Sequence, residues 1–267
     1  MPTATGTITT VAYTAPLPLK GAVIVTAASP PSPTLAVSTT MATLHTLYNR
    51  AARAFILRDI PLTYSLIESA FEVLIPPLIL PDTLADHRRK WDILRITLES
   101  TVYTSPPASN DSLPKSLQEN QIKTPQALLM GVYIRSLALF SPQNGPANPN
   151  ATHLPPQVLI TLIYSSLRVN CPEAGRIVIE EWLARRDVPI YPIQDAATKE
   201  NSYEKVLELY CLHILPKLEQ WDYAREFLEY EGELSTPIRD VSYLQPEYPW
   251  YPSDCFRQEF EEIAQVP

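Results

Sequence analysis

One segment of the chain decides its fold: Pro155-Pro156-Gln157-Val158-Leu159-Ile160-Thr161-Leu162-Ile163-Tyr164-Ser165-Ser166-Leu167-Arg168-Val169. With 3.6 residues per helical turn, its apolar side chains spread nearly all the way round a helix instead of along one stripe. A helix that is hydrophobic on all sides needs other elements to cover it on all sides. We therefore expect residues 155–169 to form a central helix of the core.

The residues that follow this segment predict a helical hairpin. Asn170-Cys171-Pro172 has the composition of a tight turn, and helical periodicity resumes over Pro172–Arg186. Short turns between helices favour antiparallel neighbours. The buried stripe of the second helix is predicted to contain Ala174, Ile177, Val178 and Trp182.

The same periodicity recurs on both sides of this hairpin. It predicts further helices at Met41–Arg58, Pro61–Ile75, Thr83–Tyr103, Thr124–Phe140, Ser202–Leu215 and Gln220–Glu231. Three local signals place helix ends: a capping box of Thr83 and Asp86, a stop at Pro216, and Gly232 as the residue just after a helix. Residues 106–123 and 141–152 are polar and are predicted to be loops.

About eight helices in hairpins of roughly 35–40 residues have the rhythm of an α-solenoid or TPR-like array, although the glycines of the TPR consensus are missing. We therefore predict an all-α fold over residues 41–236. Residues 1–40 have a single charged side chain, Lys20, and are predicted to be a low-complexity, largely disordered leader. Residues 22–27 (Ala-Val-Ile-Val-Thr-Ala) are also compatible with a short strand. Residues 237–267 form a Pro/Tyr/Trp-rich tail, in which 253–264 is compatible with a short helix.

The composition excludes two common nucleotide-binding motifs. The 267 residues include 28 prolines and only six glycines, none of which stands in a P-loop or in Gly-x-Gly-x-x-Gly. The net charge of −8 argues against nucleic-acid binding. Much of this charge is local, since residues 218–267 contain twelve acidic residues and three arginines. This acidic end is either a solvated face or a docking strip for a basic partner.

Side chains capable of catalysis or metal binding are scattered. Neither His-x-x-x-His nor His-Glu-x-x-His occurs among the four histidines, and the three cysteines form no Cys-x-x-Cys pair. An odd number of widely spaced cysteines fits a reducing compartment. We predict no enzymatic activity, no catalytic residue, no metal and no cofactor, and we expect Cys171 and Cys211 to pack as small hydrophobic residues.

Two groups of arginines are candidate partner-binding residues. Arg50, Arg53 and Arg58 surround the first predicted helix, and Arg88 and Arg89 lie on the third, near Lys90 and Arg95. Each group has two interpretations: a solvated helix face, with the second group paired to Asp86 and Asp92, or a patch that faces a partner. Three tryptophans lie on helix stripes and are expected in the core, namely Trp91, Trp182 and Trp221. Trp250 either packs back across the bundle or anchors a partner.

Two stretches carry a family resemblance. The first contains Leu154-Pro155-Pro156-Gln157-Val158-Leu159, Ile163-Tyr164-Ser165, Pro172-Glu173-Ala174 and Glu181-Trp182-Leu183. The second contains Leu207-Glu208-Leu209-Tyr210, Ile214-Leu215-Pro216 and Ala224-Arg225-Glu226-Phe227-Leu228. Residues 154–230 thereby resemble the peroxin-26 family, and residues 48–55 resemble its opening helix more loosely. The Pro-rich inserts and the leader would suit a fungal member.

The resemblance implies an adaptor in peroxisome biogenesis. Members of that family are tail-anchored in the peroxisomal membrane, and their cytosolic helical domain recruits the peroxin-1/peroxin-6 AAA+ ATPase through the N-terminal region of peroxin-6. The ATPase then recycles the import receptor for matrix protein import. By this resemblance the chain would lie on the cytosolic face of the peroxisomal membrane, held only by a C-terminal anchor that is not present in this chain. The alternative is a general α-solenoid scaffold subunit of another cytosolic assembly.

Overall fold

The computed structural model describes residues 33–78, 82–107, 113–143, 151–185 and 196–230. Within these ranges every regular element is helical, so that the all-α prediction is confirmed. The finer prediction of a TPR-like or solenoid repeat stays a prediction. Residues 1–32 and 231–267, which include most of the predicted leader and the whole predicted tail, lie outside the described residues.

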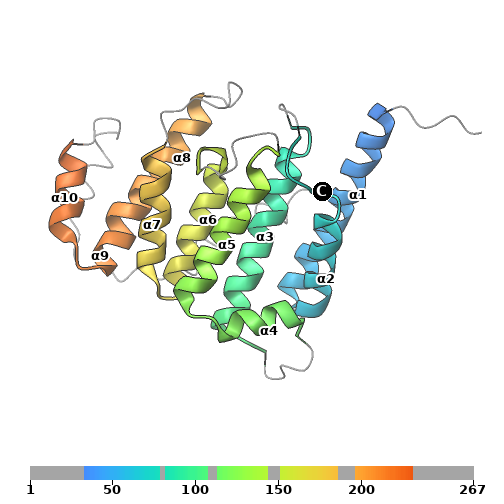
Figure 1. The fold of residues 1–267 in the computed structure, drawn as a ribbon, viewed down its shortest axis with the longest axis horizontal. Helices are drawn as coiled ribbons and strands as arrows, with labels where there is room; N and C mark the ends of the chain where they lie inside the picture. The colour runs from blue at the N-terminus through green and yellow to red at the C-terminus, as the bar shows by residue number, and fades with distance from the viewer. Residues whose placement is uncertain (1–32, 79–81, 108–112, 144–150, 186–195, 231–267) are drawn as a thin grey trace, which may run out of the picture.

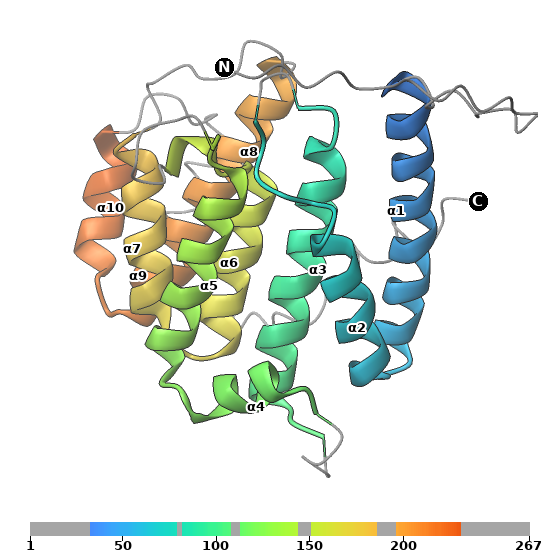
Figure 2. The ribbon, with the colours of Figure 1, turned by 45° about the vertical axis from the view of Figure 1, so that its right-hand side comes forward.

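The helices stand side by side, from α1 and α2 at one end to α9 and α10 at the other, and α4 crosses beneath the end of α3 (Figures 1 and 2). A 3₁₀ turn at Ala151–His153 precedes α6, and a π-helical turn at Tyr210–Ile214 joins α8 to α9. The bounds are α1 Pro33–Ile56, α2 Ile60–Phe71, α3 Ala85–Thr104, α4 Lys115–Ile122, α5 Pro125–Phe140, α6 Pro156–Arg168, α7 Pro172–Leu183, α8 Ala196–Leu209, α9 Leu215–Lys217 and α10 Trp221–Tyr230.

The predicted central helix is α6. All ten residues from Val158 to Leu167 are buried, and α6 packs against α3, α5, α7 and α8. Its polar residues tolerate this burial because their hydroxyl groups donate to backbone carbonyls of their own helix. Thr161 donates to Gln157 at 2.8 Å, and Ser165 donates to Thr161 at 2.8 Å. Burial on every side, as the sequence predicted, is therefore confirmed.

Three hairpin turns close in the same way. Arg58, Asn170 and Glu219 have φ values of 59°, 55° and 59° and follow α1, α6 and α9. In each turn the next residue donates its N–H to the carbonyl five residues earlier, as in Cys171 to Ser166 at 2.8 Å. This is the Schellman arrangement, which usually takes glycine. A chain with only six glycines forms it with other residues, and the predicted turn at residues 170–172 is confirmed.

Helix α3 separates two hydrophobic cores. Trp91, Leu94 and Leu98 face α1 and α2, and the Trp91 ring meets the Tyr48 ring edge to face at 5.4 Å. Ile96 instead joins the larger core that is built from α5 to α10. The side of α3 toward α5 and α6 also bears polar residues, which are described below.

Several helix ends differ from the prediction. Helix α1 begins at Pro33 and not at Met41, so that residues 33–40 are helical instead of belonging to a disordered leader. Proline is favourable in a first helical turn, because N–H groups there have no carbonyl partner within the helix and the missing N–H of proline therefore costs no hydrogen bond. The Thr83/Asp86 capping box is wrong: α3 begins at Ala85, and Asp82 accepts the Leu84 N–H at 3.0 Å.

Two segments expected to be non-helical are helical. Helix α4 lies inside the predicted loop. Of its two apolar side chains, Leu117 is fully buried and anchors the helix, whereas Ile122 is exposed. Pro216 does not end the helix before it but lies within α9. The π turn before it lets Leu215 donate to the Tyr210 carbonyl, so that the chain bends without stopping at the proline.

Two residues predicted for the core are exposed. Trp221 is 46% accessible, and Ile177 is 41% accessible. Trp221 lies on α10, the last described helix, which among the described residues packs mainly against α9 and the π turn. Trp91 and Trp182 are buried as predicted, and Cys211 is buried while Cys171 is half-buried.

Glycine at 175 is required by the approach of three helical segments. A Cβ atom there would collide with the Ser166 hydroxyl of α6 and would lie 2.8 Å from Ile214 Cδ1. We predict that Gly175→Ala lowers the free energy of unfolding by about 1–3 kcal/mol, the usual cost of overpacking. Urea unfolding followed by circular dichroism measures this loss.

Gly131 of α5 is the matched control, because a Cβ atom there meets nothing within 4 Å. Gly131→Ala should raise the free energy of unfolding by about 0.5–1 kcal/mol, since alanine loses less backbone entropy in a helix. Equal effects of the two substitutions would contradict the close packing of α6, α7 and the π turn.

Candidate functional site

The five predicted partner-binding arginines do not form one surface. Arg50 and Arg53 lie on the C-terminal half of α1, and Arg58 lies in the turn to α2. Arg88 and Arg89 lie in the first turns of α3. Figures 1 and 2 place the C-terminal end of α1 and the N-terminal end of α3 at opposite ends of the bundle. The two groups therefore cannot contact the same small partner surface.

The first group forms an exposed surface that we call the α1–α2 tip, consisting of Arg50, Arg53, Ile56, Leu57 and Arg58. All five residues are exposed, and Ile56 and Leu57 are 60% and 80% accessible. Within the described part of the chain the three arginines form no ion pair. The tip thus combines uncompensated positive charge with apolar side chains.

The local sequence explains why this charge is not neutralised. Helix α1 contains no Asp or Glu along its whole length. The nearest carboxylate in the chain, Asp59, caps α2 instead, with its side chain accepting the Leu62 N–H at 3.1 Å. Arginine carries its positive charge at any physiological pH. The tip is therefore permanently basic.

Arg88 is not a partner-facing residue, which corrects the prediction. Its side chain is 3% accessible and pairs with Asp82, and it donates to the Ile75 carbonyl at 2.7 Å. This carbonyl belongs to the segment that connects α2 to α3 and has no helical N–H to satisfy it. Arg88 therefore ties this connection to α3 and is unavailable to a ligand.

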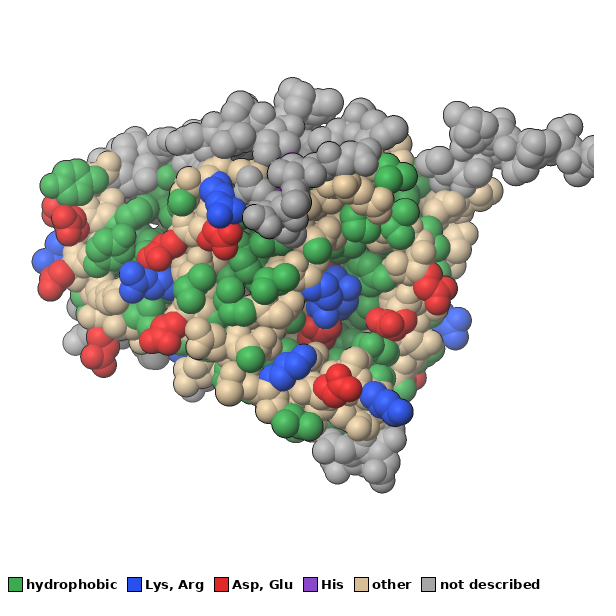
Figure 3. All heavy atoms as spheres, viewed as in Figure 1, with side chains coloured by type: hydrophobic (Ala, Val, Ile, Leu, Met, Phe, Trp, Pro, Cys, Tyr) green, Lys and Arg blue, Asp and Glu red, His purple; other side chains and the backbone are tan. Residues whose placement is uncertain are grey.

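Arg89 and Arg95 follow the other interpretation, that of paired side chains. Arg89 lies 3.0 Å from the exposed Asp86 at i,i+3, and Arg95 lies 2.6 Å from Asp92. The second pair differs from the expectation of a solvated face, because Asp92 is completely buried. In the view of Figure 3, basic and acidic side chains are interspersed over the surface without a continuous basic area.

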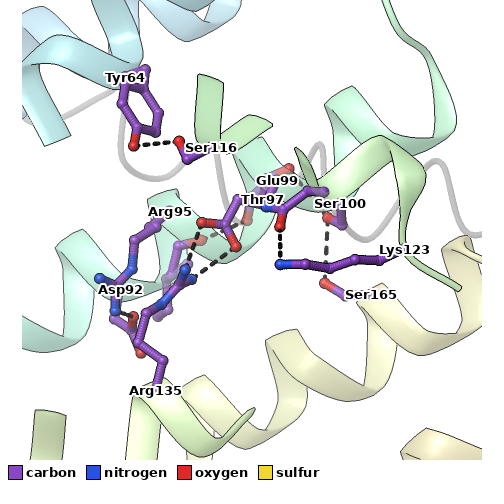
Figure 4. A network of polar contacts seen from close by, with 12 residues as sticks. Tyr64, Asp92, Arg95, Thr97, Glu99, Ser100, Ser116, Lys123, Arg135 and Ser165 are labelled. Carbon is purple, nitrogen blue, oxygen red and sulfur yellow. Dashed lines mark hydrogen bonds and ion pairs between the residues drawn. The ribbon is translucent and has the colours of Figure 1, made fainter. Parts of the chain in front are cut away.

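An ion-pair network with two buried carboxylates lies where α3 meets α5, and sequence reasoning missed it (Figure 4). Arg135 of α5 donates two hydrogen bonds of 2.8 Å each to the two carboxylate oxygens of Glu99 on α3. Arg95 pairs with Asp92 one helical turn earlier and places its guanidinium 4.0 Å from the centre of the Phe71 ring. The bidentate Arg135–Glu99 pair fixes the relative orientation of the two side chains in addition to pairing their charges.

Glu99 dominates the electrostatics of Arg135. Burial of Arg135 disfavours its positive charge, but the charge of Glu99 and its hydrogen bonds outweigh this effect, so that the pKa of Arg135 is raised. Asp92 adds a smaller contribution of the same sign. The spacing of Asp92 and Glu99, seven residues on one helix, was the signal that could have shown two carboxylates on one face of α3.

Two serine hydroxyl groups beside this network are already engaged. Ser100 donates to the Thr97 carbonyl at 3.2 Å, and Ser165 of α6 lies 3.4 Å from the Ser100 hydroxyl. On two other helices, Ser116 of α4 donates to the Tyr64 oxygen of α2 at 2.5 Å (Figure 4). These polar contacts connect α2, α3, α4 and α6, so that the network joins helices to one another.

A second polar cluster holds α7 between its neighbours. Tyr133 of α5 donates to Glu181 at 2.9 Å, and Tyr210 donates to Glu180 at 2.8 Å. Burial, reinforced by these carboxylates, raises the pKa of both tyrosines well above the ordinary value. Glu180 and Glu181 are therefore partnered by tyrosines of neighbouring elements.

The described ranges offer no group of three His, Cys, Asp or Glu side chains arranged to hold a metal ion. None of the helices in these ranges is long and apolar enough to cross a membrane. Comparison with family models, with curated proteins and with solved structures found no match. The peroxin-26 resemblance therefore enters only as support for a proposal.

We predict that the network is coupled. Arg135→Met leaves the Glu99 carboxylate, which is 5% accessible, without its partner and should cost about 3 kcal/mol. Replacing both residues, Glu99→Met with Arg135→Met, should recover most of this loss because the pair is replaced by apolar groups. Urea unfolding of the two single variants, Glu99→Met and Arg135→Met, and of the double variant gives the coupling energy.

Arg89→Met is the control, since its pair with exposed Asp86 is a surface pair worth about 0–1 kcal/mol. If the double variant loses as much stability as the two single substitutions together, the residues are not coupled.

Proposed function

We propose that this chain is a non-enzymatic adaptor of peroxisome biogenesis. It recruits the peroxin-1/peroxin-6 AAA+ ATPase, through the N-terminal region of peroxin-6, to the cytosolic face of the peroxisomal membrane. There the ATPase recycles the import receptor and sustains matrix protein import. The α1–α2 tip is the surface that binds peroxin-6. The resemblance of residues 154–230 to the peroxin-26 family supports the choice of partner.

The exposure of the α1–α2 tip is the observation that supports placing the binding surface there. Its three arginines form no ion pair with other described residues and lie within residues 50–58 together with Ile56 and Leu57, which are the kind of apolar residues that a partner can cover. Charges at the rim of an interface speed association and set specificity, whereas the central apolar contacts hold the complex. Arg88 is excluded from the proposed surface because it is buried, and Arg89 is excluded because it lies at the other end of the bundle.

Reversing the charge of the tip tests the proposal. We predict that Arg50→Glu with Arg53→Glu weakens binding to the purified N-terminal region of peroxin-6 by at least about tenfold. The attraction between these two positions and acidic groups of the partner becomes repulsion. Isothermal titration calorimetry measures the affinity. Both side chains are exposed, so that the helical circular dichroism should not change.

The matched control is Arg89→Glu with Lys90→Glu, which makes the same change of charge on α3 and should leave the affinity unchanged. Binding that is lost only in this control would place the site on α3. No binding of the unaltered chain at micromolar concentration would reject the adaptor in favour of the alternative, a helical scaffold subunit of another cytosolic assembly.

A further inference from the structure

The middle turns of α1, from Thr39 to Leu47, border a groove that no helix among the described residues covers. Helix α1 has 24 residues and α2, which packs against it, has 12, so that α1 continues past the end of α2 (Figure 2). The groove measures about 200 Å³ and lies between this part of α1 and the segment after α2. It is lined by Thr39, Thr40, Thr43, Leu44, Leu47 and Val73.

The lining is uncharged, and its apolar part is continued by other exposed side chains. Met41 is exposed on α1, and Val73, Ile75 and Leu78 are exposed along the segment after α2. Thr43 donates to the Thr39 carbonyl at 2.9 Å, and a hydroxyl group that donates can still accept a hydrogen bond. The groove therefore suits an uncharged, apolar segment whose backbone offers N–H groups.

We propose that residues 22–27 of this same chain, Ala-Val-Ile-Val-Thr-Ala, bind the groove as a removable cover. Their composition matches the lining, because they have no charge and three of the six are Val or Ile. Residues 231–267 are a poorer match, since they contain ten charged side chains. The cover is independent of the peroxin-6 proposal.

The chain length allows the cover to reach the groove. Six extended residues span about 20 Å at roughly 3.3 Å per residue, and α1 from Thr39 to Leu47 spans about 12 Å at 1.5 Å per residue. Residues 28–32 (Ala-Ser-Pro-Pro-Ser) precede α1 and are long enough for a reversal of direction. A tether this short gives an effective concentration on the order of millimolar.

Photo-cross-linking in the full chain tests the cover. With p-benzoylphenylalanine in place of Val73, we expect an intramolecular cross-link whose peptide contains residues 22–27. With the same group in place of Ile122, which is 86% accessible on α4, this cross-link should be absent. Mass spectrometry of a mixture of ¹⁵N-labelled and unlabelled chains separates links within one chain from links between copies.

Ile24→Asp should reduce the yield of this cross-link by about tenfold or more, because the loss of one buried aliphatic side chain is worth roughly that factor. Thr10→Asp, which adds the same charge outside the segment, should leave the yield unchanged. A cross-link to residues 231–267, a link between copies, a yield no higher than at Ile122, or a yield insensitive to Ile24→Asp would each overturn the proposal.

Discussion

The burial of α6 on every side is the constraint on which the rest of the structure depends. Ten consecutive residues, from Val158 to Leu167, are withdrawn from water, so that the protein needs a neighbour in each direction around one helix. Helices α3, α5, α7 and α8 supply them. The hydroxyl groups of α6 permit this because they are satisfied by carbonyls of their own helix, and the apolar side chains provide the driving force.

Helix α3 contributes side chains to both hydrophobic cores. Its apolar side packs against α1 and α2, and its other side meets α5 and α6 with a mixture of Ile96 and polar residues. The Glu99–Arg135 pair gives that contact a direction and a register that apolar packing alone would not provide. The two halves of the bundle are thus joined by this ion pair as well as by apolar packing, since Phe71 packs against both cores.

The two proposed binding surfaces lie on the same helix, the tip at its C-terminal end and the groove along its middle turns, and they arise for different reasons. The α1–α2 tip is basic because α1 contains no carboxylate and Asp59 is engaged in capping α2. The groove exists because α1 extends beyond α2 and leaves Leu44 and Val73 beside an open space. One surface recognises charge, whereas the other is suited to an uncharged segment. The two therefore select different occupants.

Local periodicity in the sequence was sufficient to predict the all-α class, the central α6 and the α6–α7 hairpin, since these depend on residues close together in the chain. Periodicity did not decide whether the α1–α2 tip is exposed. It also did not reveal the Glu99–Arg135 pair, although the seven-residue spacing of Asp92 and Glu99 places two carboxylates on one face of α3. Only the tertiary structure decided that Arg88 is buried, that Trp221 is exposed and that Leu117 holds α4. Their environments are set by residues distant in sequence, because burial depends on which helix lies opposite and not on the helix itself.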